Sequence, residues 1–559
     1  MTGKEYPEGT FDFKAMVTGD HYFVDKTMMI ADVCKAVNKT FLYTRPRRFG
    51  KSTNLSMLNY YFNMKYKDEE DIFKGLYIET CDKCEEFKNA YPVIWMNFGD
   101  LASSSSEMFE YSLSNMIASV ARDANIILEG HNVRPEDKAI ISRAYASQLN
   151  PIEVRKFIRT LCAIYRDVFG KKTIILVDEY DHCIQNIHSR TKFDEIIQLL
   201  GPFMEQSFKF NEDIQFGVVT GIMPLAKTSM LSSFNNASVC SILDKQGDEF
   251  FGFTEEEVIR LLKETGNPPE KITEIREWYD GYRFGDKEVY NPYSVIMYLK
   301  KGCVPKAYWV NMTGGGLSED LIASMGRETL QNLKEISEGK RTIESPIDTA
   351  IAYPDILRPG ADPSLIYSYL AMSGYLKTVD TMEQVGGKSL CTVSMVNKEV
   401  SYTFDTIVKR ATDLDTYVQR AVDAIYDVDP DVLKDNLESM LSGLAMDEDW
   451  VKAANDTELH NKYRDVFMAY LMDPLHTAKE EQPFGIGRTG ICFPGSDRFR
   501  PIIIEVKSTR KEGTDLHALA KEGLKQIESK GYSKQQGMRD AIRVGIGVWM
   551  KTVEVAIEK

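Results

Sequence analysis

The N-terminal part of the chain alternates short apolar segments with longer amphipathic ones. Four apolar segments predict strands, at residues 41–44, 93–98, 173–178 and 214–220. The segment 173–178 is apolar on both faces, which is typical of a strand buried inside a parallel sheet. Residues 107–124 and 152–169 have the spacing of amphipathic helices. This alternation predicts the α/β fold class and a first domain over residues 1–253.

The pattern changes after residue 253. Thr254-Glu-Glu-Glu257 has the character of a capping box and starts a part of the chain in which helical patterns dominate. We expect a helical lid and middle region over residues 254–455. Residues 456–559 return to alternating helix and strand, with apolar strands at 501–506 and 544–549. They predict a separate, small α/β domain.

Length, charge and cysteine content limit the class of protein. A chain of 559 residues is too long for one hydrophobic core, and its net charge of −15 disfavours a broad nonspecific nucleic-acid surface but not a local basic groove. No apolar run has the length of a membrane span and the N-terminus lacks an apolar signal core, so we expect a cytoplasmic protein with no membrane partner. The nine cysteines show no disulfide framework. Cys81 and Cys84 form a lone CxxC, for which ordinary turn and core thiols are favoured over a metal site.

The segment Arg45-Pro-Arg-Arg-Phe-Gly-Lys-Ser52 has the order of a phosphate-binding loop. Such a loop follows a buried strand, turns its backbone N–H groups inward, and opens a helix with Lys and Ser or Thr. Gly50 permits close backbone approach, Lys51 would reach the β- and γ-phosphates, and Ser52 would ligate Mg2+. Arg45 stands where GxxxxGK[ST] has its first glycine, so a solvated basic loop is the alternative interpretation.

Two acids follow the predicted strand 173–178. In P-loop enzymes an acid at the place of Asp178 holds Mg2+ through water, and the next acid, here Glu179, orients or deprotonates the attacking water. Surface acids at a strand end are the alternative. Thr220 ends the next apolar strand, where related ATPases often place a polar residue that senses the γ-phosphate, and an ordinary strand-end threonine is the alternative there. The candidate nucleotide contacts are Arg45, Arg47, Arg48, Phe49, Gly50, Lys51, Ser52, Thr53 and Thr220.

With these residues the chain resembles the AAA-ATPase-like bacterial P-loop proteins, which often carry a C-terminal PD-(D/E)XK nuclease-like domain. Further segments that agree are Tyr22-Phe-Val-Asp-Lys-Thr27, Val177-Asp-Glu-Tyr-Asp181, Thr220-Gly-Ile-Met223, Phe234-Asn-Asn236, Trp278-Tyr-Asp-Gly-Tyr-Arg283 and Tyr290-Asn-Pro-Tyr-Ser294. The resemblance covers most of residues 1–310. It implies an ASCE-type P-loop ATPase domain that uses ATP and Mg2+, followed by a helical, winged-helix-like lid. Related ATPases often work as oligomers, so a homo-oligomer is an expected partner state.

The last domain carries half of a nuclease motif. Glu505 and Lys507 are two residues apart at the end of a predicted strand, so their side chains face the same side. In a PD-(D/E)XK site the carboxylate would bind Mg2+ and the lysine would position or activate water. The helix at 516–532, with Gln526 and Tyr532, resembles the family's next element.

The other half departs from the family pattern. Family members show Gly-x-Gly-Arg-x-Asp, whose Asp is the main metal ligand, whereas this chain reads Gly485-Ile-Gly-Arg-Thr-Gly490. Pro483 also stands where a glutamate is common, and the open replacements for the acid are Asp497, Glu480 and Glu481. We therefore expect a degenerate, weak or inactive nuclease fold, with an active one as the alternative.

The leading hypothesis is an ATP-binding protein, a Mg2+-dependent ATPase, coupled to this nuclease-like domain. The first alternative is a nucleotide-gated module that binds nucleic acid or a protein and seldom hydrolyses ATP. The second is an active metal-dependent DNA nuclease in phage defence. In each case the C-terminal domain is the expected place for a nucleic-acid partner.

Overall fold

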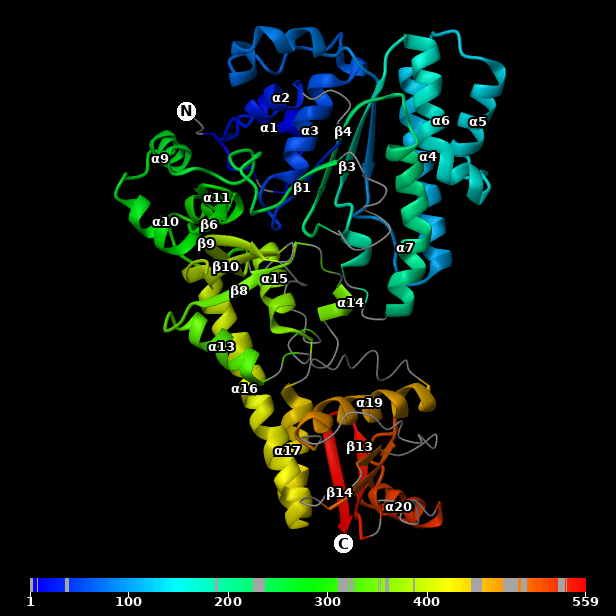
Figure 1. Cartoon of the computed structure of the whole chain (residues 1–559), viewed down its shortest axis with the longest axis vertical. Coiled ribbons are helices and arrows are strands. Elements are labelled where there is room, and N and C mark those ends of the chain that lie inside the picture. The colour runs from blue at the N-terminus through cyan, green and yellow to red at the C-terminus, as the bar shows by residue number, and fades with distance from the viewer. Residues whose placement is uncertain are drawn as a thin grey trace. The chain divides into compact units, whose positions relative to one another are not determined.

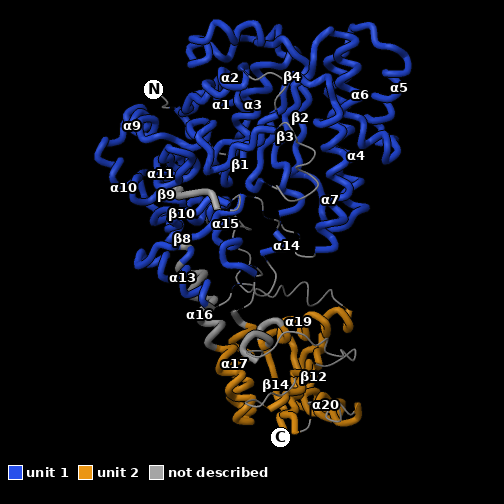
Figure 2. The backbone as a smooth tube through the Cα atoms, viewed as in Figure 1, with its two compact units in different colours: residues 1–405 blue, residues 406–559 orange. Residues whose placement is uncertain are grey.

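The computed structural model falls into two compact units, Met1–Asp405 and Thr406–Lys559 (Figure 2). It describes residues 4–7, 9–35, 40–185, 187, 190–224, 237–309, 321, 325, 327–349, 351, 353–356, 361–385, 388–443, 455–475, 491–493, 500–530, 538 and 540–559. The segments 483–490, 497 and 234–236 singled out above lie outside these residues, as do Glu480, Glu481 and Tyr532. The boundaries of the three domains expected from the sequence stay a prediction.

A five-stranded parallel sheet forms the centre of the first unit (Figure 1). Its strands are β1 Thr40–Thr44, β2 Val93–Asn97, β3 Thr173–Asp178, β4 Ile214–Gly221 and β5 Ala237–Cys240, in the order β2-β3-β4-β1-β5. Every residue of β3 is buried, as its two apolar faces predicted. The α/β class is therefore confirmed for this part of the chain. Because β4 lies between β1 and β3, the carboxyl ends of these three strands meet at one edge.

Helices and short turns of helix connect the strands. Their bounds are α1 Phe13–Thr18, α2 Met28–Val33, α3 Lys51–Phe62, η1 Met64–Tyr66, η2 Tyr77–Thr80, η3 Asp82–Phe87, α4 Ser106–Ile127, α5 Pro135–Tyr145, α6 Pro151–Phe169, η4 His182–Ile184, α7 Arg190–Met204 and η5 Glu205–Lys209. The sequence specifies α6 at both ends. Asn150 and Glu153 form a reciprocal capping box, and Gly170 ends the helix in the left-handed conformation. The apolar faces of α4, α6 and α7 pack with β3 into the main core.

The rest of the first unit mixes helices with small antiparallel sheets. Its elements are α9 Glu255–Glu264, α10 Lys271–Tyr279, β6 Tyr282–Phe284, β7 Lys287–Val289, α11 Pro292–Lys300, α13 Arg327–Ser337, β8 Ile343–Ile347, α14 Tyr353–Ile356, α15 Pro363–Ser373, β9 Leu376–Val385 and β10 Lys388–Met395. The capping box predicted at Thr254 is confirmed at the start of α9. The hairpin β6–β7 and the sheet β8-β10-β9 were not predicted. The winged-helix-like character of this region stays a prediction.

The second unit contains a four-stranded sheet of order β11-β12-β13-β14, in which only β12 and β13 run parallel. Helix α16 Lys398–Asp427 leads into it, and its elements are α17 Pro430–Gly443, α19 Asp456–Leu475, β11 Ile491–Phe493, β12 Ile502–Ser508, α20 Leu516–Ser529, β13 Ile542–Trp549 and β14 Thr552–Glu558. Gly545 and Gly547 let α20 lie close on β13, because a Cβ at either position would clash with backbone carbonyls of that helix or its start. None of the described helices is long and apolar enough to cross a membrane.

Candidate functional site

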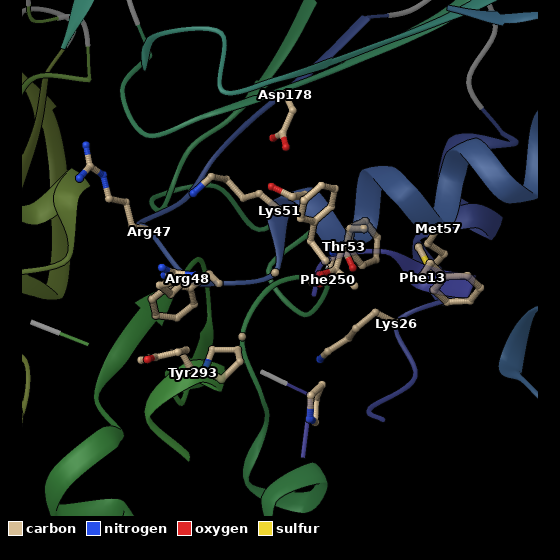
Figure 3. A pocket seen from close by; sticks show the side chains of 18 of the residues that line it. Phe13, Lys26, Arg47, Arg48, Lys51, Thr53, Met57, Asp178, Phe250 and Tyr293 are labelled. Atoms are coloured by element: carbon tan, nitrogen blue, oxygen red, sulfur yellow. Dashed lines mark hydrogen bonds between the residues drawn. The ribbon is translucent and has the colours of Figure 1, made fainter. Parts of the chain in front are cut away.

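A cavity of about 530 Å³ lies where β1 to β4 end and α3 begins (Figure 3). The predicted residues that line it are Arg47, Arg48, Phe49, Gly50, Lys51, Ser52, Thr53, Asp178 and Glu179. The opposite wall comes from the N-terminal segment, including Phe13 and Lys26, and from α11 with Tyr293. The structure therefore brings the basic loop and the two acids of β3 to one place, as their positions at strand ends predicted.

The loop before α3 bends sharply at two positions. Gly50 has φ +84° and Arg48 has φ +68°, so both adopt the left-handed conformation that favours glycine. Gly50 is the residue before the first turn of α3, and among the described residues no side chain caps that turn. The first backbone N–H groups of a helix have no partner within it, so an uncapped helix start at a cavity is suited to bind an anion.

Lys51 extends back over its own loop. Its Nζ donates hydrogen bonds to the carbonyl oxygens of Arg45 at 3.0 Å and Pro46 at 2.7 Å. Burial lowers the pKa of Lys51 to about 8, and the nearby carboxylates of Asp178 and Asp181 oppose that shift. The ammonium is thus held by two neutral acceptors that an anionic phosphate can replace.

Asp178 is held in place by its neighbours at the sheet edge. Its Oδ1 accepts hydrogen bonds from the Thr220 hydroxyl at 2.6 Å and from the backbone N–H of Glu179 at 3.1 Å. Thr220 is fully buried and does not line the cavity, so it acts on the site through Asp178. Glu179 has φ +51°, and its half-exposed carboxylate lies 3.6 Å from His182 Nδ1. This unusual backbone places the second acid at the cavity rather than in the strand register.

Asp181 is a site residue that the sequence motifs did not predict, although it ends the family-like segment Val177-Asp-Glu-Tyr-Asp181. Its Oδ2 accepts from the backbone N–H groups of Ile222 at 2.9 Å and Met223 at 2.7 Å, so it fixes the turn that follows β4. Burial raises the pKa of Asp181. Asn97 also lines the cavity, because it ends β2 opposite Asp178 in the sheet register. The sequence feature that could have identified Asn97 is its position as a polar residue at the end of an apolar strand.

Arg45 does not reach the cavity. Its side chain is fully buried, and its guanidinium donates to the carbonyl oxygens of Thr44, Cys240 and Gly247. The guanidinium also lies over the rings of Phe251 and Phe284, at 5.3 and 4.8 Å from their centroids. Arg45 therefore ties the end of β1 to the segment after β5, and we remove it from the expected phosphate contacts.

The other loop arginines remain at the cavity. Arg47 donates to Gln185 Oε1 at 3.1 Å, and the guanidinium of Arg48 lies 5.1 Å from the centroid of the Tyr293 ring. Figure 3 shows Arg48 beside Tyr293. It also shows Lys26 on the side of the cavity that lies away from Asp178. Lys26 is paired with Glu257 at 2.7 Å, so its charge is already compensated.

The E-x-K residues of the second unit form a partly buried polar cluster, in which Glu505 is buried. Glu505 and Lys507 lie on β12, and Gln526 on α20 bridges them by donating to Glu505 Oε1 at 2.6 Å and accepting from Lys507 Nζ. The second oxygen of Glu505, Oε2, is buried and has no hydrogen-bond partner among the residues that the structure describes. Burial raises the pKa of Glu505 to about 7, and the cations of Lys507 and Lys530 act against that rise.

Comparison with known proteins supports the ATPase-like part of the resemblance. The model of a family described as "Predicted AAA-ATPase" matches residues 7–231, which include β1 to β4 and the loop at 45–52. A protein of Azotobacter chroococcum mcd 1, described as "Uncharacterized protein in vnfD 5'region", is 26% identical over 306 residues. That alignment covers 54% of this chain and 53% of the relative, so the chain spans about half of its length. The family match indicates nucleotide binding by the first unit, and it ends before the second unit begins.

Proposed function

We propose that the cavity of the first unit binds ATP with Mg2+ and hydrolyses it. One observation carries this proposal: Lys51, Ser52, Asp178 and Glu179 line the same cavity at the carboxyl edge of a parallel sheet. Ligands of open α/β sheets bind at that edge. The cavity of about 530 Å³ is also within the usual range for small-molecule sites, roughly 300–1,000 Å³.

The proposed roles follow from the chemistry of each group. The uncapped start of α3 and the ammonium of Lys51 would bind phosphate oxygens. Ser52 and Asp178 would hold Mg2+, which supplies charge neutralisation at the phosphates when bound. Among the described residues no group of three or more His, Cys, Asp or Glu is placed to hold a metal ion. This fits an ion that takes most of its ligands from phosphate and water, as Mg2+ does at nucleotide sites.

Glu179 is the proposed base. Its carboxylate is half exposed at the cavity, and its contact with His182 at 3.6 Å is also exposed, so it can orient or deprotonate a water molecule. Asp178 differs from it, because its Oδ1 is already occupied by two donors. The two acids therefore support different roles, one in holding the metal and one in activating water.

The test compares ATP binding and hydrolysis by wild type, Lys51→Ala and Glu179→Gln, with and without single- and double-stranded DNA. Loss of a hydrogen bond to a charged group costs about 1.5–3 kcal/mol, so Lys51→Ala should weaken ATP binding about 10- to 150-fold. Glu179→Gln should keep ATP affinity and lose roughly 10²- to 10⁴-fold in turnover. Glu107→Gln, at the start of α4, is the matched control. The proposal fails if Lys51→Ala leaves binding and hydrolysis unchanged.

Binding without turnover in wild type would instead favour the nucleotide-gated module. In that protein Glu179→Gln would have no turnover to lose, whereas Lys51→Ala would still weaken ATP binding. Titration calorimetry and single-turnover hydrolysis therefore separate the two functions. The same assays with DNA present show whether nucleic acid and ATP influence each other, which is what coupling to the second unit requires.

A second candidate function is metal-dependent hydrolysis of phosphodiesters by the second unit. The observation in its favour is that Oε2 of Glu505 has no partner within the described part of the second unit, because a divalent cation would satisfy a buried carboxylate oxygen. Glu505 is a single acid, and no metal-holding cluster is found in the part of the chain that the structure describes. We therefore expect little DNase activity with Mg2+ or Mn2+. Robust cleavage that Lys507→Ala abolishes would show an active nuclease instead.

A further inference from the structure

Three cysteines lie near one another in the first unit, at a turn that is hydrogen-bonded to helix α3. Cys81 and Cys84 lie at the junction of η2 and η3, and their Sγ atoms are 2.8 Å apart. Cys34, which follows α2, adds a third thiol close enough to Cys84 that each influences the pKa of the other. Cys84 is buried, whereas Cys34 and Cys81 are partly exposed. The Sγ atoms of Cys81 and Cys84 are closer together than the interpretation as ordinary turn and core thiols requires.

A metal ion does not account for this cluster. Within the described ranges, no three His, Cys, Asp or Glu side chains are arranged as metal ligands, and this includes the three thiols. A structural zinc site takes four ligands, most often cysteine and histidine. Thiol–disulfide chemistry needs only two sulfurs within reach of one another, which Cys81 and Cys84 provide.

We propose that Cys81 and Cys84 form a redox-active dithiol that closes to an intramolecular disulfide, with Cys34 as the alternative partner of Cys84. The oxidant is a low-molecular-weight disulfide such as oxidised glutathione. The Cys81 thiolate attacks one sulfur of the oxidant and releases one thiolate. The Cys84 thiolate then attacks the Cys81 sulfur of the mixed disulfide and releases the second. Two protein thiols are oxidised, one disulfide is reduced, and both protons pass to the two released thiols.

The order of these steps follows from exposure. Burial raises the pKa of Cys84 to about 11 and also raises that of Cys34, so both are protonated at neutral pH. Cys81 is partly exposed and is the thiol that an external disulfide can reach. Cys84 enters only in the second, intramolecular step, where its closeness to Cys81 compensates for its small thiolate fraction.

The thiol-bearing turn is joined to the wall of the cavity. In η2 the backbone N–H of Tyr77 donates to Asp25 Oδ2 at 2.6 Å, and that of Ile78 donates to Thr27 Oγ1 at 3.0 Å. Lys26, which lines the cavity, lies between these two acceptors in the chain. The Tyr61 hydroxyl of α3 also donates to the Cys84 carbonyl oxygen at 3.0 Å. The turn that carries the dithiol is therefore hydrogen-bonded to a segment that also lines the candidate nucleotide site.

Peptide mapping of the full chain tests the proposal. The protein is incubated with oxidised glutathione, its free thiols are alkylated, and it is digested with trypsin. Lys83 lies between the two cysteines, so Cys81 falls in the peptide 75–83, Cys84 in 84–88 and Cys34 in 27–35. We expect the peptides 75–83 and 84–88 to be linked in most molecules, and dithiothreitol to separate them.

Variants identify the partners in the disulfide. In Cys81→Ser the link should move to the peptides 27–35 and 84–88. Cys303→Ser, a partly exposed thiol elsewhere in the first unit, is the matched control and should oxidise like wild type. The proposal is overturned if folded wild type yields free Cys81 or only its glutathione adduct. It is also overturned if the purified protein holds one equivalent of zinc that protects these thiols until a chelator is added. The readout is the peptide linkage, so it does not depend on nucleotide binding.

Discussion

Replacing Thr220 by valine removes one hydrogen bond from a buried acid of the candidate site. The Thr220 hydroxyl donates to Asp178 Oδ1 at 2.6 Å, and both side chains are buried. A hydrogen bond to a charged group contributes about 1.5–3 kcal/mol, and valine has nearly the shape of threonine, so no large cavity opens. We expect the sheet to lose that stability. This corresponds to a roughly 10- to 150-fold loss of protection against amide hydrogen exchange in β1, β3 and β4.

Thr44→Val is the matched control. Thr44 ends the neighbouring strand, is fully buried, and its hydroxyl has no hydrogen-bond partner in the described part of the chain. Removing an unpartnered buried hydroxyl should leave stability unchanged or raise it by up to about 1–3 kcal/mol. Hydrogen exchange read by mass spectrometry compares the strands directly and does not require the whole chain to unfold in two states. If both variants lower protection equally, the bond to Asp178 contributes nothing and the reasoning is refuted.

Two further predictions concern titratable groups. Burial lowers the pKa of Lys51 to about 8, and a bound phosphate favours the charged amine, so ATP affinity should hold below that pH and fall by up to about tenfold per pH unit above it. Calorimetry across this range checks the slope, which Lys51→Met should lack. Burial raises the pKa of Glu505 from 4.5 to about 7, so the folded carboxyl binds its proton more tightly than the unfolded one. The free energy of unfolding of the second unit should therefore fall by about 3 kcal/mol as the pH rises from 4.5 to about 7. Hydrogen exchange of β12, corrected for intrinsic exchange rates, measures this loss. Glu505→Gln should not show it.

The elements of the parallel sheet were the most predictable part of the fold. The strand predicted at 173–178 has those bounds in the structure, and the helix predicted at 152–169 differs by one residue. Both carry a strong pattern, because the strand is buried on both faces and the helix on one. The small sheets after Phe253 were missed, because their strands mix polar and apolar residues without a clear period. Strands β9 and β10 pair with each other across a short connection, and their bulges interrupt the alternation.

A residue of the candidate site could be predicted only where its type and its position at the end of a strand were enough to identify it. Lys51, Asp178 and Glu179 needed nothing more than their order along the chain. The partner of Asp178 needed the strand order, because Thr220 reaches it only when β4 lies next to β3. Asp181 was missed for a similar reason. Its role is to hold two backbone N–H groups about 40 residues further along the chain, a contact that no local pattern contains.

The incomplete loop motif has a physical explanation in the position of Arg45. A glycine is required where the backbone is left-handed or where another group approaches closely, and Arg45 is not among the left-handed residues of the described chain. Its backbone N–H donates to the Gly221 carbonyl oxygen at 3.0 Å, which continues the pairing of β1 with β4. Its side chain points away from the cavity, toward the Cys240 carbonyl oxygen. The left-handed positions are Arg48 and Gly50, and only the second is a glycine. Arg45 thus leaves the cavity side of the loop unobstructed, and the backbone strain of this loop is concentrated at Arg48, the residue that faces Tyr293.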